Sequence, residues 1–161
     1  MLAMHTILHP TDFSEHSTAA LRLGCALARD HGARLVLLHV VMPPTIVYGE
    51  GLLPPEPDSI FQEAREQLGR LEVPGAGLAI DRRCTEGDPV TEILRVAQEI
   101  RTDLIVMGTH GRTGLGRLLM GSVAEEVVRK APCPVMTVKT PSALAESAAS
   151  GASRPEVLAA G

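Results

Sequence analysis

The sequence predicts an α/β protein: a single-domain, open five-stranded parallel sheet with helices on both faces. Over the 161 residues, five short apolar segments alternate with four segments of helical periodicity. The segment 34–41 is almost continuously apolar, which is typical of a strand buried on both faces of a parallel sheet. Because strands and helices alternate, the crossovers are expected to be right-handed and to cover both faces of the sheet.

Clear stop and start signals separate the expected elements. Pro10 stops the first strand, Gly32 ends the first helix, and Asp88 followed by Pro89 starts the third helix. The segment 77–84 alternates more than the other strands and is therefore expected near a sheet edge. The strands are expected at 4–9, 34–41, 77–84, 103–107 and 134–139, and the helices at 15–31, 59–71, 89–100 and 123–130.

Two regions lie outside this alternation. Residues 42–57 are rich in proline and glycine, and a loop of this length inside a compact domain is often functional. From residue 140 onwards the chain is biased towards alanine, serine, glycine and proline. We therefore expect one domain over residues 1–140 and a mobile C-terminal tail over 141–161.

Composition argues against several classes of function. The net charge of -4 gives no electrostatic reason to expect binding to nucleic acid or to a membrane surface. No apolar run approaches the length of a membrane span, and the first residues lack the pattern of a secretion signal. Cys25, Cys84 and Cys133 are scattered without CxxC spacing, which indicates reduced thiols in a cytoplasmic protein rather than disulfides or a zinc site.

The most informative segment is the glycine-rich stretch 108–123, between the fourth strand and the last helix. Its glycines let backbone N–H groups approach a ligand, and the helix that follows adds the positive end of its dipole. Ser122 is expected to cap this helix, with Glu125 completing a capping box. Arg112 and Arg117 add positive charge. These features favour a phosphate, although an ordinary strand-to-helix connection stays open because no P-loop signature is present.

The spacing of this segment resembles a known family. Gly108, two residues, Gly111, nine residues and Gly121-Ser122 match the ATP-binding pattern of universal stress proteins, G-x2-G-x9-G-[S/T]. Residues 7–14, 37–40 and 133–138 are similar to the flanking strands of that family, and the resemblance covers residues 4–139 in order. It implies a Rossmann-like fold similar to that of the adenine nucleotide alpha hydrolases, and the role of a nucleotide-dependent stress-response protein.

The resemblance also implies a binding site and a partner. The backbone amides of the glycine segment would hold the ribose and phosphates of ATP, expected together with Mg²⁺. Asp12 would reach the nucleoside, Val40 the adenine edge through its backbone, and Met107 a wall of the site. Family members commonly form homodimers through the last strand, here residues 134–138, and an exposed edge strand favours such pairing. The implied site residues are Pro10, Thr11, Asp12, Val40, Met107, Gly108, Gly111, Arg112, Gly121, Ser122 and Val123.

Other functions remain as alternatives. A slow Mg²⁺-dependent ATP hydrolase would need a group that positions water, and Asp12 is the one carboxylate that the sequence places near the site. A phospho-acceptor domain is disfavoured because Asp12 stands alone after the first strand. A dimeric interaction module without nucleotide would conflict with the intact glycine spacing. Asp12 itself is alternatively an N-cap of the first helix, a role for which Thr11 and Ser14 also qualify.

The remaining histidines, methionines and cysteines are interpreted as structural. His9 and His39 lie in expected strands and are predicted to be packed or hydrogen-bonded rather than catalytic. His110 lies in the glycine segment, where it is either a ligand contact or a solvated side chain. Core positions are predicted for Met42, Met107, Met136, Cys25 and Cys133.

Overall fold

The computed structural model describes residues 3–43, 57–109 and 120–139. The loop predicted at 42–57 and the tail predicted at 141–161 therefore lie largely or wholly outside the described residues. The elements are β1 (Thr6–Pro10), α1 (Glu15–His31), β2 (Arg34–Val41), α2 (Pro57–Arg70), β3 (Ile80–Glu86), α3 (Pro89–Glu99), β4 (Leu104–Gly108), α4 (Ser122–Lys130) and β5 (Val135–Val138).

The five strands form one parallel sheet in the order β3-β2-β1-β4-β5. The predicted fold class is confirmed, and β3 lies at an edge as its alternating pattern predicts. The chain builds β2 and β3 on one side of β1 and then returns to build β4 and β5 on the other side. The strand order therefore reverses between β1 and β4, which is where sheets of this kind bind ligands.

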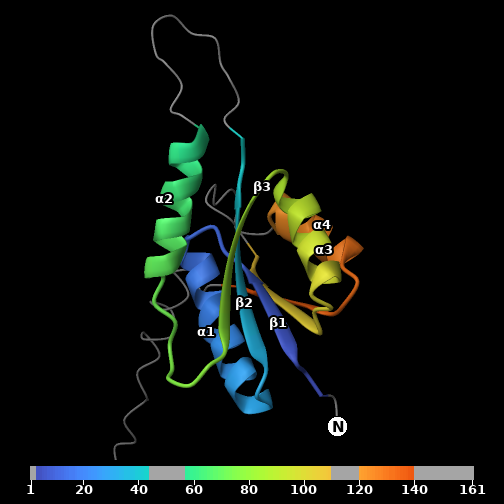
Figure 1. Cartoon of the computed structure of the whole chain (residues 1–161). Coiled ribbons are helices and arrows are strands. Elements are labelled where there is room, and N and C mark those ends of the chain that lie inside the picture. Colours follow the sequence, from blue (N-terminus) through green and yellow to red (C-terminus); the bar gives the residue numbers. More distant parts are fainter. Residues whose placement is uncertain (1–2, 44–56, 110–119, 140–161) are drawn as a thin grey trace, which may run out of the picture.

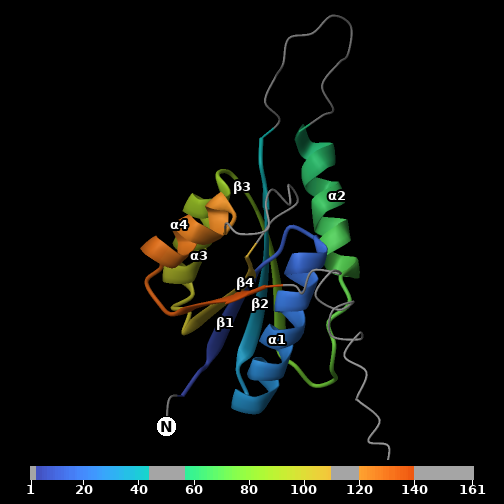
Figure 2. The same ribbon diagram turned by 180° about the vertical axis from the view of Figure 1, so that it is seen from behind.

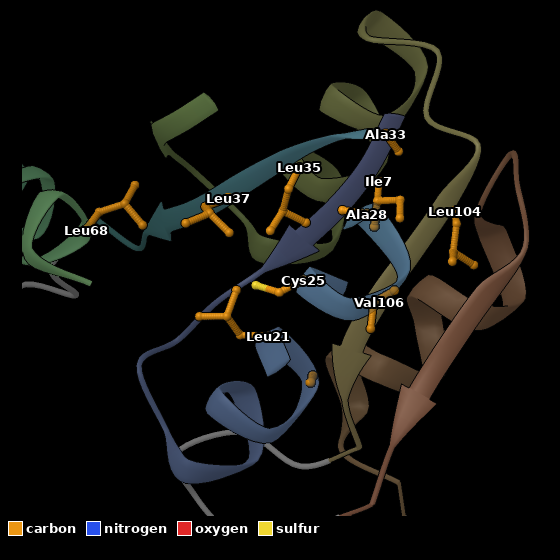
Figure 3. Packing of buried hydrophobic residues seen from close by; sticks show 11 residues of the cluster. Ile7, Leu21, Cys25, Ala28, Ala33, Leu35, Leu37, Leu68, Leu104 and Val106 are labelled. Carbon is orange, nitrogen blue, oxygen red and sulfur yellow. The ribbon is translucent and has the colours of Figure 1, made fainter. Parts of the chain in front are cut away.

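Helices cover both faces of the sheet, and each face has its own core. Figures 1 and 2 show α1 and α2 on one face and α3 and α4 on the other. On the first face, Ile7, Leu35 and Val106 of the strands pack against α1. Figure 3 shows Cys25 and Ala28 of α1 among these strand residues. On the second face, Leu8, Leu38 and Ile105 pack against buried residues of α3 and α4.

Two of the four helices, α1 and α3, begin and end close to their predicted limits for identifiable reasons. Ser14 is the N-cap of α1 and accepts a hydrogen bond from Ser17 N, and Gly32 ends the helix with a φ of 64°. Asp88 caps α3 by accepting from Thr91 N, with proline at the first position. Of the three N-cap candidates Thr11, Asp12 and Ser14, Ser14 fills the position, so the alternative N-cap role of Asp12 is wrong.

Several predicted boundaries differ from the structure. Pro10 was predicted to follow the first strand, but it is the last residue of β1. A proline at a strand end costs little, because its missing N–H removes few hydrogen bonds there. The helix α2 starts two residues earlier than predicted, and β3 spans Ile80–Glu86 rather than 77–84. The predicted capping box at Ser122 and Glu125 is also wrong: Ser122 is the first helical residue, and the N-cap is Gly121, which has no side chain.

Some predicted core residues are exposed. Met107 is buried as predicted, but Met42 and Met136 are 65% and 38% exposed. Met42 follows the last residue of β2, and Met136 lies on the edge strand β5, so neither has a neighbouring strand on both sides. Cys25 is buried, whereas Cys133 is half-buried. Residue type alone does not distinguish a central strand from an edge strand, which is why these predictions failed.

Candidate functional site

The strand ends bring most of the predicted site residues to one edge of the sheet. In the parallel register, Pro10 at the end of β1 lies opposite Leu38 of β2, and Ile7 lies opposite Leu104 of β4. The residues that follow β1 and the residues that end β2 and β4 therefore meet at the carboxyl edge. This edge includes the point between β1 and β4 where the strand order reverses.

The turn after β1 is closely held by its neighbours. Thr11 N donates to Leu38 O at 2.8 Å, and His39 Nδ1 donates to Thr11 O at 2.8 Å. The ring of His39 also lies 4.4 Å from the ring of Phe13. Phe13 adopts a left-handed φ of 64°, which is unusual for a residue with a bulky side chain. Such backbone conformations concentrate at functional sites.

Asp12 sits in this turn as a half-buried carboxylate. Its Oδ1 accepts from Ser14 N at 3.0 Å and from Ser14 Oγ at 2.6 Å. The carboxylate thus fixes the residue that caps α1, while Ser14 itself accepts from Ser17 N at 3.2 Å. Asp12 consequently has a structural role in the turn, and it also places negative charge at the carboxyl edge of the sheet.

The end of β4 passes very close to α1. An ideal Cβ on Gly108 would lie 3.0 Å from both the carbonyl carbon and the carbonyl oxygen of His16. Glycine therefore allows β4 and α1 to pack this closely, because a side chain at position 108 would press on the backbone of α1. Beyond Gly108, Thr109 N donates to Val138 O at 3.0 Å, and Gly121 N donates to Thr109 O at 2.7 Å. The second of these bonds ties the start of α4 to the end of β4.

The first turn of α4 presents backbone amides without a side-chain cap from its N-cap residue. Gly121 occupies that position with φ of -60° and ψ of 149°. The first amides of a helix have no partner within the helix, and the helix dipole makes this end attractive to anions. Ser122 is exposed at this end, with its hydroxyl on the first helical residue.

Three apolar residues of the predicted site come together on the face that α3 and α4 cover. Met107 is a buried member of the core cluster there, and Val40 and Val123 are partly buried against the same cluster. They come from the ends of β2 and β4 and from the start of α4. These apolar residues thus lie at the same carboxyl edge as the polar turn at Thr11 and Asp12, a combination common in small-molecule sites.

Two predicted site residues, Gly111 and Arg112, lie outside the described residues, as do His110 and Arg117. Among residues 3–43, 57–109 and 120–139, no group of three or more His, Cys, Asp or Glu side chains is arranged to hold a metal ion. In the same ranges, no helix is both long enough and apolar enough to cross a membrane. A cavity of about 520 Å³ lies between α1 and the segment 71–74 and contains none of the predicted site residues in its lining.

His9 of β1 is packed and hydrogen-bonded as predicted, and the structure adds the identity of its partners. His9 is completely buried, and its Nδ1 lies 2.8 Å from Val106 O of β4. Its Nε2 lies 3.5 Å from Ser17 Oγ of α1. Burial lowers the pKa of His9 to about 4, against the smaller opposing effects of the Val106 carbonyl and the Asp12 charge. The ring is therefore neutral at pH 7, as expected for a hydrogen-bonded structural histidine.

The sheet is parallel in the order β3-β2-β1-β4-β5, and a glycine-rich segment connects β4 to α4. These features define a doubly wound α/β protein, a class that binds ligands at the carboxyl ends of its strands. Residues 4–139 match the family model of the universal stress proteins. The chain belongs to the universal stress protein family.

Curated relatives and solved structures agree with this assignment. A universal stress protein of Methanocaldococcus jannaschii is 37% identical, with 84% of this chain and 82% of that protein covered. A Thermus aquaticus universal stress protein is also 37% identical, with 83% and 98% covered. The solved structure of a hypothetical protein, MJ0577, superposes with a TM-score of 0.73 at 30% identity, covering 88% and 100% of the two chains.

Some structures in this family contain adenine nucleotides. A universal stress protein in complex with cAMP superposes with a TM-score of 0.61 at 26% identity, covering 87% of this chain and 100% of that chain. An Archaeoglobus fulgidus family member in complex with dAMP superposes with a TM-score of 0.58. At 22% identity, the second likeness shows the shared fold alone.

Proposed function

We propose that this protein binds ATP at the carboxyl edge of its sheet and acts as a nucleotide-dependent regulatory protein of the stress response. The observation that supports this most is the meeting of the turn after β1, the end of β4 and the uncapped start of α4 at the reversal point. The G-x2-G-x9-G-[S/T] spacing between β4 and α4 adds a run of glycine amides suited to phosphates.

Each predicted residue then has a place in the complex. The adenine ring packs against the apolar wall of Val40, Met107 and Val123, and the Val40 backbone meets its edge. Pro10, Thr11 and Asp12 approach the nucleoside. The amides at Gly121 and Ser122 face the phosphates, where the positive end of the α4 dipole favours negative charge. Gly108, Gly111 and Arg112 complete the set implied by the glycine spacing.

Mg²⁺ is proposed to enter with ATP rather than to occupy a protein cage. Mg²⁺ keeps several waters and is commonly bound through one or two carboxylates together with substrate phosphates. The described residues hold no cluster of three possible ligands, and Asp12 lies in the turn after β1. This arrangement fits a phosphate-bound ion. It also favours binding over turnover, so slow hydrolysis of ATP is the second candidate function.

A homodimer through β5 is part of the proposal. β5 and β3 are the two edges of the sheet. Along β3 the charged residues Asp81, Arg83 and Glu86 discourage pairing with another strand, and Arg83 is tied to Glu99 of α3 at 2.8 Å. β5 instead exposes Met136 between valine and threonine neighbours.

The unpaired cysteines agree with a cytoplasmic location.

Calorimetry of the nucleotide-stripped full chain tests this function. Titration with ATP and Mg²⁺ is expected to show saturable binding of one nucleotide per chain, and parallel titrations with ADP and cAMP measure the preference among adenine nucleotides. A phosphate-release assay on the same samples separates binding from hydrolysis. Absence of binding heat for all three nucleotides would reject the proposed site and favour the interaction-module alternative.

A further inference from the structure

A hydrogen-bonded relay of buried groups, formed by Val106 O, His9, Ser17 and Thr11, runs from β4 to the turn after β1. It begins at Val106 O, which lies 2.8 Å from His9 Nδ1. A carbonyl oxygen can only accept a hydrogen bond, so Nδ1 must bear the ring proton. In a neutral imidazole the other nitrogen, Nε2, is then an acceptor that needs a donor. Ser17 Oγ is the hydroxyl next to it, at the long distance of 3.5 Å.

The direction of the hydrogen bonds in this relay follows from counting protons. Ser17 Oγ lies 2.7 Å from Thr11 Oγ1 as well as 3.5 Å from His9 Nε2, and Ser17 has one hydroxyl proton. Ser17 Oγ can donate to Thr11 Oγ1, but its one proton is then not available to His9 Nε2. Both contacts are hydrogen bonds only when Thr11 donates to Ser17 and Ser17 donates to His9. Ser17 and Thr11 are 4% and 7% exposed, so bulk water is a poor substitute for either partner.

The relay ends at Phe13, the residue of the turn with a left-handed backbone conformation. Thr11 Oγ1 accepts from Phe13 N at 3.2 Å, and Phe13 has the left-handed φ of 64°. A left-handed conformation is unfavourable for an L-residue with a Cβ, so surrounding contacts must hold it. His39 of β2 supplies a second restraint, because it donates to Thr11 O and packs its ring against Phe13.

We propose that His9 is a positioning residue for the nucleotide site, acting through the hydroxyls of Ser17 and Thr11 to hold the Phe13 turn in its left-handed conformation. The inference rests on the proposed function, since the turn contains Thr11 and Asp12 of the predicted site. The relay joins the two sides of the reversal point, because Val106 belongs to β4 and the turn follows β1. Its loss frees the turn without removing a ligand-contacting group.

Ser17→Ala is the sharpest variant for this relay. Alanine is the best helix former and leaves the hydrogen bond from Ser17 N to Ser14 Oγ in place, so α1 is expected to fold. Thr18→Ala is the matched control, since its exposed hydroxyl donates to Ser14 O outside the relay. Ser17→Cys retains a weak donor and is expected to give an intermediate result. His9→Asn is a second route, which keeps a donor near Val106 O and removes the Nε2 position.

Two readouts are measured by NMR without nucleotide. In the wild type, long-range ¹H–¹⁵N spectra are expected to show the Nδ1–H tautomer of His9. Amide hydrogen exchange at Phe13 is expected to accelerate by about tenfold or more in Ser17→Ala and His9→Asn, and to stay unchanged in Thr18→Ala. The amide of Val96 in α3 reports global stability. Its exchange rate is expected to differ among the variants much less than the exchange rate of Phe13 does.

The ATP affinity of the same variants completes the test. Ser17→Ala and His9→Asn are expected to weaken ATP binding by about fivefold to tenfold, while Thr18→Ala binds as the wild type does. Wild-type exchange at Phe13 in folded Ser17→Ala, or an Nε2–H tautomer of His9, would overturn the relay. If the wild type binds no adenine nucleotide, the proposed function fails and with it the positioning role, while the exchange data still decide separately whether the relay holds the turn.

Discussion

Gly108, the last residue of β4, lies against the backbone of His16 in the first turn of α1, so that a Cβ at Gly108 would approach the His16 carbonyl group to 3.0 Å. This contact limits how closely the end of β4 and the helix that follows β1 can approach each other. The glycine that begins the nucleotide-binding pattern is thus also a packing requirement of the fold.

Gly108→Ala is therefore expected to lower the free energy of unfolding by about 1–3 kcal/mol, the usual cost of overpacking against atoms that cannot move away. Gly69→Ala is the control, because nothing lies within 4 Å of its Cβ position in α2. It is expected to stabilise the protein by about 0.5–1 kcal/mol. Urea denaturation of the wild type and of both variants measures these free energies of unfolding. If Gly108→Ala were as stable as the wild type, the His16 backbone would have moved aside without destabilising the protein.

Gly121→Val is expected to fold and to lose ATP binding. The φ of -60° and ψ of 149° at Gly121 are accessible to any residue, so the backbone tolerates a side chain there. A branched side chain at the N-cap would stand between the first amides of α4 and the phosphates, and we expect affinity to fall by about tenfold or more. Calorimetry measures the affinity and circular dichroism the fold. Normal ATP binding by folded Gly121→Val would show that the site lies elsewhere.

The buried His9 makes stability depend on pH. The pKa of His9 is lowered to about 4 in the folded protein from its ordinary value of 6.5, so between these values the unfolded chain binds a proton that the folded protein does not. The free energy of unfolding is therefore highest above pH 6.5 and falls by about 1.4 kcal/mol per pH unit as the pH drops, to a total of about 3 kcal/mol near pH 4.

Urea denaturation between pH 7.5 and 5 isolates this effect from most carboxylate titration. His9→Asn is expected to lose the slope attributed to His9, whereas His31→Gln, at an exposed position at the end of α1, keeps it. Identical slopes for the wild type and His9→Asn would mean that His9 is as easily protonated in the folded protein as in the unfolded chain.

Met136→Asp is expected to convert the proposed dimer into a monomer. The side chain is 38% exposed on the edge strand β5, and a charge there opposes pairing of two such strands. Val128→Asp, where the valine is 45% exposed, introduces the same charge on the helix α4 instead of the edge strand and is expected to leave strand pairing intact. Light scattering after size-exclusion chromatography gives the masses. A monomeric wild type would reject the dimer.

The sequence predicted the central elements well because local signals there agree with the fold. The limits of α1 and β2 match the predicted 15–31 and 34–41, since Gly32 punctuates one and a continuous apolar run defines the other. The edges were harder. Met136 is as apolar as a central residue, and its exposure depends on having a strand on one side only.

The residues of the candidate site stay a prediction, but the structure shows which of them come together. Spacing identified the glycines, and the structure brings Val40, Met107 and Val123 to one core cluster. The relay could not be found from sequence, because His9 and its partner Val106 are 97 residues apart and become neighbours only when β1 pairs with β4. The N-cap at Gly121 was missed because a serine beside it fitted the capping-box pattern better.

The most direct test of the central claim is a titration of the ¹⁵N-labelled chain with ATP and Mg²⁺, followed by amide chemical shifts. The account predicts saturable shifts at Thr11, Val40 and Gly121, with little change at Gly69 on the exposed side of α2. Absence of saturable shifts, or shifts confined to the cavity between α1 and the segment 71–74, would contradict a nucleotide site at the carboxyl edge of the sheet.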